Sequence, residues 1–238
     1  SMHFNKKTNS WRALKPISSN SIVLHGMFGH SMDIEGERAL IGSKDGNIAV
    51  SYLFDEASLS WVENYTFSPL KLQSEGRFGF SVALLNDKAF IGYPGYNQKG
   101  EVHVFNLEGD VWKNHQIISS NTAVEKSYFG SSLNAKGDRL AIGSFNGESV
   151  DIFKIDSGAY INSQTLSPQN LTGSKFGRSL YLGDNKLVVG ATYGQIAYLY
   201  KNDNQSWKIN EVLSSSNRNE SLINSYSPCT LGNLSNYY

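Results

Sequence analysis

The motif Phe-Gly-x-Ser occurs four times, beginning at Phe28, Phe78, Phe129 and Phe176. A glycine followed by a hydroxyl side chain could cradle a phosphate, but such a loop needs several backbone N–H groups that converge at the start of a helix. Each motif here leads into an apolar segment without a helical period. We therefore predict that the motif is structural: the Phe packs between units of the fold, the Gly permits a close approach or an unusual φ, and the Ser forms a hydrogen bond near a crowded axis.

Residues for other kinds of catalysis are scattered along the chain. Glycoside hydrolysis needs two carboxyl groups about 5 to 10 Å apart, and Asp33 is the only acid in the segments that follow the four motifs. The five histidines, at positions 3, 25, 30, 103 and 115, lack the spacing of metal ligands, and no Ser-His-Asp arrangement is recognisable. Cys229 stands alone, which excludes an internal disulfide. We predict a protein that is not an enzyme and has no metal site and no cofactor.

Other landmarks repeat in a constant register with these motifs. The Phe-Gly pairs are separated by 50, 51 and 47 residues, and a second Gly follows each Phe at a distance of 14 residues. Between them lie turns that read EGE, LND, KGD and GDN, which have the chemistry of hairpin turns. Aromatic residues spaced by seven complete the unit: Phe54 and Trp61, Phe105 and Trp112, Phe153 and Tyr160, Tyr200 and Trp207, with Phe4 and Trp11 as a partial copy.

Each unit reads as four short strands, so the fold is predicted to be all-β. Four-stranded units of about 50 residues are typical of the antiparallel blades of a β-propeller. The repeats run over residues 28–77, 78–128, 129–175 and 176–226 of a single domain, 2–238. Residues 2–27 and 227–238 are predicted to share a fifth blade, which closes the ring and removes its open edge. The alternative is that the chain ends partway through a longer propeller.

The repeats resemble the FG-GAP repeats of integrin α-subunit propellers, and especially the bacterial FG-GAP pattern. The segment from Phe78 to Trp112, FGFSVALLNDKAFIGYPGYNQKGEVHVFNLEGDVW, matches that pattern almost throughout, with Tyr93-Pro94 in place of Ala-Pro. The resemblance covers essentially the whole chain and implies a propeller with a secreted or surface-exposed binding role. Many FG-GAP hairpins bind Ca²⁺ through an Asp-x-Asp-x-Asp-Gly loop, which the short turns here lack, so we expect no calcium site.

Charge and hydropathy limit the kinds of partner that we expect this protein to bind. Lys and Arg number 21, as do Asp and Glu, so the net charge gives no general attraction to nucleic acid. No apolar stretch approaches the roughly 20 residues that span a bilayer, and the N-terminus lacks the apolar core of a signal peptide. We expect a monomer that binds no nucleic acid and does not insert into a membrane. Its location stays open, although the resemblance favours a secreted or cell-surface protein.

Two sets of side chains differ between the repeats and are expected at one end of the channel. They are the residue between Phe-Gly and Ser, and residues of the loop between the second and third strands. The first set is His30, Phe80, Ser131 and Arg178; the second is Tyr93, Tyr96, Phe145 and Tyr193, beside Lys44 and Asp45. Aromatic and arginine side chains suit contact with a protein partner or stacking on a sugar, whereas the alternative is that they plug the channel and pack the loops.

These observations predict a non-catalytic binding module that presents one loop face to a protein partner. The alternative is a carbohydrate-binding, lectin-like propeller with a similar pocket in each repeat. The loops between the second and third strands differ in length and residue type. This irregularity favours one protein site over several equal sugar sites.

Overall fold

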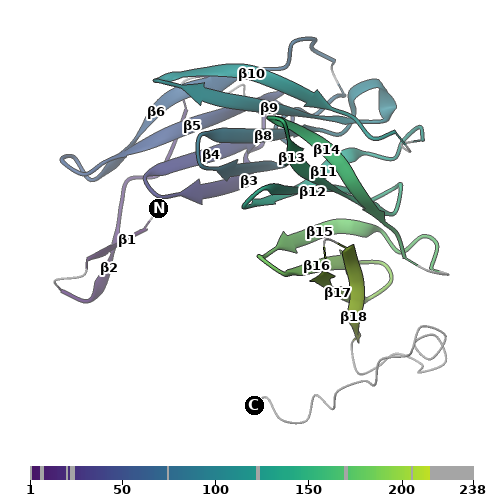
Figure 1. Ribbon diagram of the computed structural model, residues 1–238. Coiled ribbons are helices and arrows are strands. Elements are labelled where there is room, and N and C mark those ends of the chain that lie inside the picture. The colour runs from purple at the N-terminus through teal and green to yellow at the C-terminus, as the bar shows by residue number, and fades with distance from the viewer. Residues whose placement is uncertain are drawn as a thin grey trace.

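A computed structural model describes residues 2–5, 8–19, 21, 25–73, 75–121, 124–168, 171–204 and 206–214. Most of them belong to four antiparallel four-stranded sheets (Figure 1). The first sheet contains β3 (Phe28–Glu35), β4 (Arg38–Ser43), β5 (Ile48–Asp55) and β6 (Ser60–Phe67). The second contains β7 (Val82–Leu85), β8 (Lys88–Tyr93), β9 (Glu101–Glu108) and β10 (Val111–Ile118), with a short 3₁₀ helix, η1 (Tyr96–Gln98), between β8 and β9.

The third and fourth sheets repeat this order. The third contains β11 (Phe129–Lys136), β12 (Arg139–Ser144), β13 (Ser149–Asp156) and β14 (Ala159–Leu166). The fourth contains β15 (Phe176–Leu182), β16 (Lys186–Ala191), β17 (Ile196–Asp203) and β18 (Ser206–Ser214). Each sheet is a meander in which strands adjacent in sequence pair with one another, through connections of two to seven residues. The predicted all-β fold of four-stranded antiparallel units is confirmed.

Hydrogen bonds between sheets explain the Ser of the repeated motif. The hydroxyl of Ser31 donates to the carbonyl of Gly79 at 2.9 Å, that of Ser81 to Gly130 at 2.6 Å, and that of Ser132 to Gly177 at 2.7 Å. Each bond joins the first strand of one sheet to the Phe-Gly turn of the next. The sequence-based prediction that the Ser forms a structural hydrogen bond is therefore confirmed.

The second Gly of each unit leaves room for this contact. A Cβ on Gly143 would lie 2.1 Å from the Ser132 hydroxyl and 2.2 Å from the Gly177 carbonyl oxygen. Gly92 meets Ser81 and Gly130 in the same way, at 2.3 and 2.1 Å. Because any side chain at these positions would overlap the next sheet, the spacing of 14 residues is a packing requirement.

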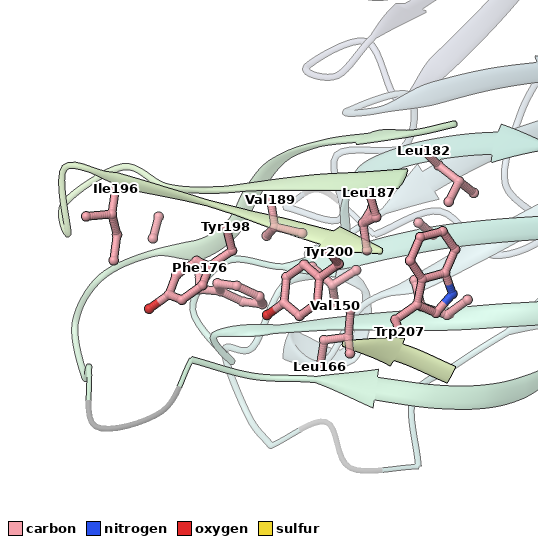
Figure 2. Packing of buried hydrophobic residues seen from close by; sticks show 13 residues of the cluster. Val150, Leu166, Phe176, Leu182, Leu187, Val189, Ile196, Tyr198, Tyr200 and Trp207 are labelled. Atoms are coloured by element: carbon pink, nitrogen blue, oxygen red, sulfur yellow. The ribbon is translucent and has the colours of Figure 1, made fainter. Parts of the chain in front are cut away.

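The core is divided into layers between neighbouring sheets. The Phe of each later motif is fully buried: Phe78, Phe129 and Phe176 have no exposed surface. Figure 2 shows one such layer, in which Val150 and Leu166 of the third sheet pack against Phe176, Val189 and Tyr200 of the fourth. The Phe of the motif is thus a wedge between sheets, as predicted. Its burial accounts for a large share of each interface, because an aromatic side chain buries 150–250 Å².

The N-terminal segment forms a separate two-stranded sheet. Strands β1 (Met2–Asn5) and β2 (Ser10–Ala13) pair so that Phe4 lies opposite Trp11, as Phe54 lies opposite Trp61 in the first sheet. Figure 1 shows this hairpin standing apart from the four sheets. The described residues thus form four complete sheets and not the predicted five, and residues 227–238, the other half of the predicted fifth blade, lie outside them.

One equivalence read from the sequence is wrong. In the later sheets the aromatic residue before the turn is not opposite the Trp: Leu107 pairs with Trp112, and Phe105 pairs with Ala89 of the neighbouring strand. In the first sheet Tyr52 occupies the place of Phe105, because the turn before Trp61 is two residues longer. Phe54 and Phe105 share a spacing to Trp but not a position.

We expect Gly143→Ala to lower the free energy of unfolding by about 1–3 kcal/mol, because the added Cβ forces two sheets apart. Urea denaturation followed by circular dichroism measures this change. Gly183→Ala is the matched control, since a Cβ there would meet its nearest atom at 3.5 Å. Equal stability of the two variants would contradict the packing role of Gly143.

Candidate functional site

Each Phe-Gly pair lies inside a tight turn at one end of its sheet. The backbone N–H after the Gly donates to the carbonyl three residues earlier at 3.1 to 3.2 Å, and the Gly has a φ of 83° to 87°. A positive φ at the third residue is what a type II turn requires. The turn therefore presents one variable side chain on each side of Phe-Gly. These pairs are Met27 and His30, Arg77 and Phe80, Tyr128 and Ser131, and Lys175 and Arg178.

The turns between the second and third strands lie at the same end of each sheet. A backbone N–H from each of them donates to the segment just before the Phe-Gly turn of its own unit, at 2.8 to 3.2 Å. These bonds run from Asp45 to Gly26, Gly95 to Gly76, Asn146 to Ser127, and Tyr193 to Ser174. We call this end of the molecule the mouth face; it comprises residues 26–30, 44–47, 76–80, 94–100, 127–131, 145–148, 174–178 and 192–195.

Backbone strain marks the mouth face in every repeat. The residue before Phe is left-handed each time, with φ of 54° at Met27, 60° at Arg77, 57° at Tyr128 and 58° at Lys175. Non-glycine residues rarely adopt such a φ, and backbone strain is concentrated at functional sites. The conformation is built into the repeat, whereas the side chains that it carries differ.

The first cluster on this face surrounds an imidazole. The ring of His30 lies edge-on to the ring of Phe80, with 4.8 Å between centroids. The Lys44 ammonium lies 2.8 Å from the Asp45 carboxylate. Partial burial, followed by the charges of Lys44 and Arg77, lowers the pKa of His30 below 6.5, whereas Asp45 opposes this shift. His30 is therefore mainly neutral at pH 7, the form in which an imidazole can accept a proton.

The second cluster combines aromatic rings with cations. The rings of Tyr128 and Phe145 are stacked, with 5.2 Å between centroids and an angle of 7°. The guanidinium carbon of Arg178 lies 5.3 Å from the Phe145 centroid. The Lys175 ammonium lies 5.6 Å from Phe145 and 5.9 Å from Tyr193, a ring that is 69% exposed. These contacts orient two cations at an accessible aromatic surface.

A carboxylate beside this second cluster is already engaged in hydrogen bonds. Glu148 accepts hydrogen bonds from the backbone N–H groups of Gly173 and Lys175 and from the Ser174 hydroxyl, at 2.7 to 2.8 Å. It thereby holds the loop that carries Lys175. Within the part of the chain that the structure describes, neither Arg77 nor Arg178 forms an ion pair. The mouth face can therefore offer both guanidinium groups to an anion.

Three of the side chains selected from the sequence are buried or half-buried below this face. Ser131 is buried, and its hydroxyl donates to the Gly143 carbonyl at 3.1 Å. Tyr93 is fully buried, and its hydroxyl accepts the N–H of Gln73 at 2.7 Å. Tyr96 is half-buried beside Tyr93. The other five lie on the mouth face with surface exposed: His30, Phe80, Phe145, Arg178 and Tyr193.

Sequence reasoning missed the residue that precedes each Phe. Arg77, Tyr128 and Lys175 occupy this position in three repeats, and each contributes a charge or a ring to one of the two clusters. The signal was available in the sequence. The position is variable at fixed spacing, and it is the first residue of a four-residue turn whose last residue had been selected.

Two features are absent from the described residues. Among the residues that the structure describes, no three His, Cys, Asp or Glu side chains are grouped so that they could hold a metal ion. In the same residues no helix is long and apolar enough to cross a membrane.

We expect Lys44→Met to raise the pKa of His30, because it removes a nearby positive charge and leaves Asp45 in place. An NMR titration of the imidazole measures the change, with Lys136→Met at the opposite end of the sheets as control. Folding favours neutral His30, so its contribution to stability is present above the unfolded pKa near 6.5 and is lost as the pH falls through the folded pKa. An unchanged pKa in Lys44→Met would show that the Lys44 charge does not act on the ring.

Solved structures resemble this chain, although no protein-family model and no curated protein sequence matches it. A provisionally named 6-phosphogluconolactonase from Bacteroides uniformis aligns with this chain with a TM-score of 0.64 and 12% sequence identity. The alignment covers 91% of this chain and 63% of the Bacteroides uniformis chain. One from Bacteroides fragilis gives 0.62 at 10% identity, covering 90% and 63%. A protein from Lactobacillus plantarum gives 0.61 at 9% identity, covering 92% and 64%.

The likeness shows the fold. These structures are β-propellers of four-stranded antiparallel sheets, and this chain spans just under two thirds of their length. The propeller that the FG-GAP resemblance implied is thereby supported, whereas membership of the FG-GAP family is not shown.

The same finding overturns the prediction of a non-catalytic binding module. Two of the similar propellers are named for a hydrolytic activity, so this architecture gives no ground for excluding an enzyme. The prediction had a specific weakness. It considered only enzymes that use a carboxylate pair, a metal cluster or a Ser-His-Asp arrangement. A lactone can be opened by one base and a cation without any of these.

Proposed function

We propose that this protein hydrolyses the lactone of a small anionic sugar at its mouth face. The observation that carries the proposal is the combination, on one face, of a neutral imidazole with cations oriented on aromatic rings. Lys175 and Arg178 are held at Phe145, and His30 is held against Phe80 beside Lys44. A phosphorylated sugar-acid lactone has the three features that such a face would recognise: an anionic group, a C–H-rich ring and an electrophilic carbonyl.

The second cluster suits the anionic end of this substrate. A guanidinium lying over Phe145 keeps its N–H edges available, and these can fork onto two phosphate oxygens. Lys175 adds a second positive charge 5.6 Å from the centroid of the same ring. The exposed ring of Tyr193 offers a surface for stacking on a sugar.

The first cluster suits the reaction itself. Neutral His30 takes a proton from water as the water oxygen attacks the carbonyl carbon of the lactone. The negative charge that develops on the carbonyl oxygen is stabilised by Arg77 or Lys44. When the bond from the carbonyl carbon to the ring oxygen breaks, the imidazolium returns its proton to that oxygen, which leaves a hydroxyl group and a carboxylic acid that ionises.

The shared fold with two provisionally named 6-phosphogluconolactonases supports this choice of substrate class. The sequence landmarks also support two finer proposals, that the repeats are of the FG-GAP type and that the ring has five blades. The proposed activity depends on neither of them. It depends on the mouth face, which is formed by the four repeats.

The direct test is hydrolysis of 6-phosphogluconolactone, followed as acid release at constant pH and corrected for the spontaneous rate. We expect activity in the unaltered protein and a loss of about tenfold or more in kcat for His30→Gln, as for removal of a general base. Arg178→Ala should instead raise KM, because it removes binding of the phosphate. Gluconolactone, which lacks the phosphate, should be a poor substrate for the unaltered protein and should be affected little by Arg178→Ala.

Lys136→Ala, at the opposite end of the sheets, is the matched control and should retain full activity. A rate no faster than the spontaneous one would refute the proposed activity. Equal rates in the unaltered protein and in His30→Gln would refute the role of His30. Binding of the phosphorylated sugar without turnover would identify the face as a ligand site only.

A further inference from the structure

The third sheet buries a carboxylate that no basic side chain neutralises. Asp151 of β13 has no exposed surface. It lies opposite Ile142 of β12, on the side of the sheet where Ile142, Leu140 and Phe129 form the apolar layer against the second sheet. Among the ion pairs of the described residues, none includes Asp151. An uncompensated charge in such surroundings is costly, so buried charges in proteins are paired or bind a metal ion.

Only one oxygen of this carboxylate has hydrogen-bond partners. Oδ1 of Asp151 accepts the side-chain N–H of Asn162 at 3.1 Å and the hydroxyl of Thr165, both on β14. Hydrogen bonds donated to a carboxylate favour its ionised form. Oδ2 is buried and has no hydrogen-bond partner among the described residues. Asp151 therefore keeps one buried, negatively charged oxygen that the surrounding side chains do not satisfy.

A second unsatisfied oxygen lies on the same side of the third sheet. Ser144 is 2% exposed, and its hydroxyl has no hydrogen-bond partner among the described residues. Ser144 follows Ile142 by two residues on β12, so it is a diagonal neighbour of Asp151 on one face of the sheet. Ser127, also 2% exposed, is close by: a Cβ on Gly147 would lie 3.0 Å from the Ser127 Cβ and 3.3 Å from the Ser144 Cβ. We call Ser127, Ser144 and Asp151 the inner polar cluster.

The repeat itself does not require polar groups at these positions. In the second sheet they carry rings, and both rings have a partner: the Tyr93 hydroxyl accepts the N–H of Gln73, and Nε2 of His103 lies 2.7 Å from the Glu101 carboxylate. Of the four sheets, only the third has a carboxylate there. The residues equivalent to Ser144 and Asp151 are Ser43 and Val50 in the first sheet, Tyr93 and His103 in the second, and Ala191 and Tyr198 in the fourth.

We propose that the inner polar cluster binds one small monovalent cation, held by Oδ2 of Asp151 and the hydroxyl oxygen of Ser144. One positive charge balances one buried carboxylate, whereas a divalent ion would leave an excess charge in an apolar layer. Calcium and magnesium also take more oxygen ligands than this cluster offers.

Such a site needs a single acid. It is therefore compatible with the finding that the described residues contain no group of three His, Cys, Asp or Glu side chains that could hold a metal ion. The sequence-based expectation of no metal site considered only the spacing of such groups and the acidic loops that bind calcium. The proposal does not rest on the proposed enzymatic activity.

Thermal unfolding of the full chain in different chloride salts tests the proposal. The salts are those of sodium, potassium, ammonium and choline at equal ionic strength, and choline is too large to enter a site between packed sheets. An ion that binds only the folded state raises the Tm as its concentration rises. We expect at least one of the three small cations to raise the Tm by several degrees over choline, with a saturable dependence on concentration. Circular dichroism measures the transition.

Asp151→Asn removes the charge while its amide oxygen can still accept the hydrogen bonds from Asn162 and Thr165. We expect this variant to lose the dependence of the Tm on the cation. Asp138→Asn is the matched control, because it removes a carboxylate of the same sheet that is 49% exposed, and it should keep the dependence. Ser144→Ala leaves the charge in place and should raise the cation concentration of half-maximal effect several-fold.

An equal Tm in all four salts would overturn the proposal and would show that a proton or water satisfies the carboxylate instead. A cation dependence that persists in Asp151→Asn would also overturn it, because the ion would then bind elsewhere. If Asp151→Asn does not fold, Ser144→Ala decides the question. An unchanged half-saturating concentration in that variant would contradict binding at the inner polar cluster.

Discussion

The contact between the Ser of one sheet and the Phe-Gly turn of the next is the constraint on which this structure depends. It requires a hydroxyl donor within 3 Å of a carbonyl, a residue without a side chain beneath it, and a wedge that fills the space behind it. Ser132, Gly143 and Gly177 meet these requirements in one interface, and Phe176 provides the wedge. Because every interface between sheets must meet the same conditions, the same residue types recur at fixed spacing in each unit. A mismatch at one of them would separate whole sheets.

This constraint also creates the mouth face. A turn with its third residue at positive φ fixes the path of the chain and leaves the first and fourth residues outside the contact. These two positions can therefore vary without disturbing the packing. In this protein they carry Arg77, Lys175 and Arg178, beside rings such as Phe80 and Tyr128. Rigid strands support them, which limits the reorganisation that a bound anion would require.

A fold of this kind decides the position of a site but not its chemistry. The propeller arrangement is shared with proteins that differ from this chain at about nine of every ten aligned residues. What distinguishes this mouth is its irregularity: it carries a neutral imidazole in one cluster and two cations on aromatic rings in the other. Such asymmetry suits a single small substrate better than a set of equal subsites.

The sequence by itself determined the repeat, the strand order, the structural role of Phe-Gly-x-Ser and the end of the sheets at which variable residues gather. It could do so because the alternation of strands and the chemistry of turns are local. The tertiary structure alone decided which variable residues are accessible. Tyr93 and Ser131 fit the sequence criterion as well as His30 and Arg178, yet both are buried, with hydrogen bonds to Gln73 and Gly143, which lie 20 and 12 residues away in the chain. Such contacts depend on how sheets and loops pack in three dimensions, which no local pattern encodes.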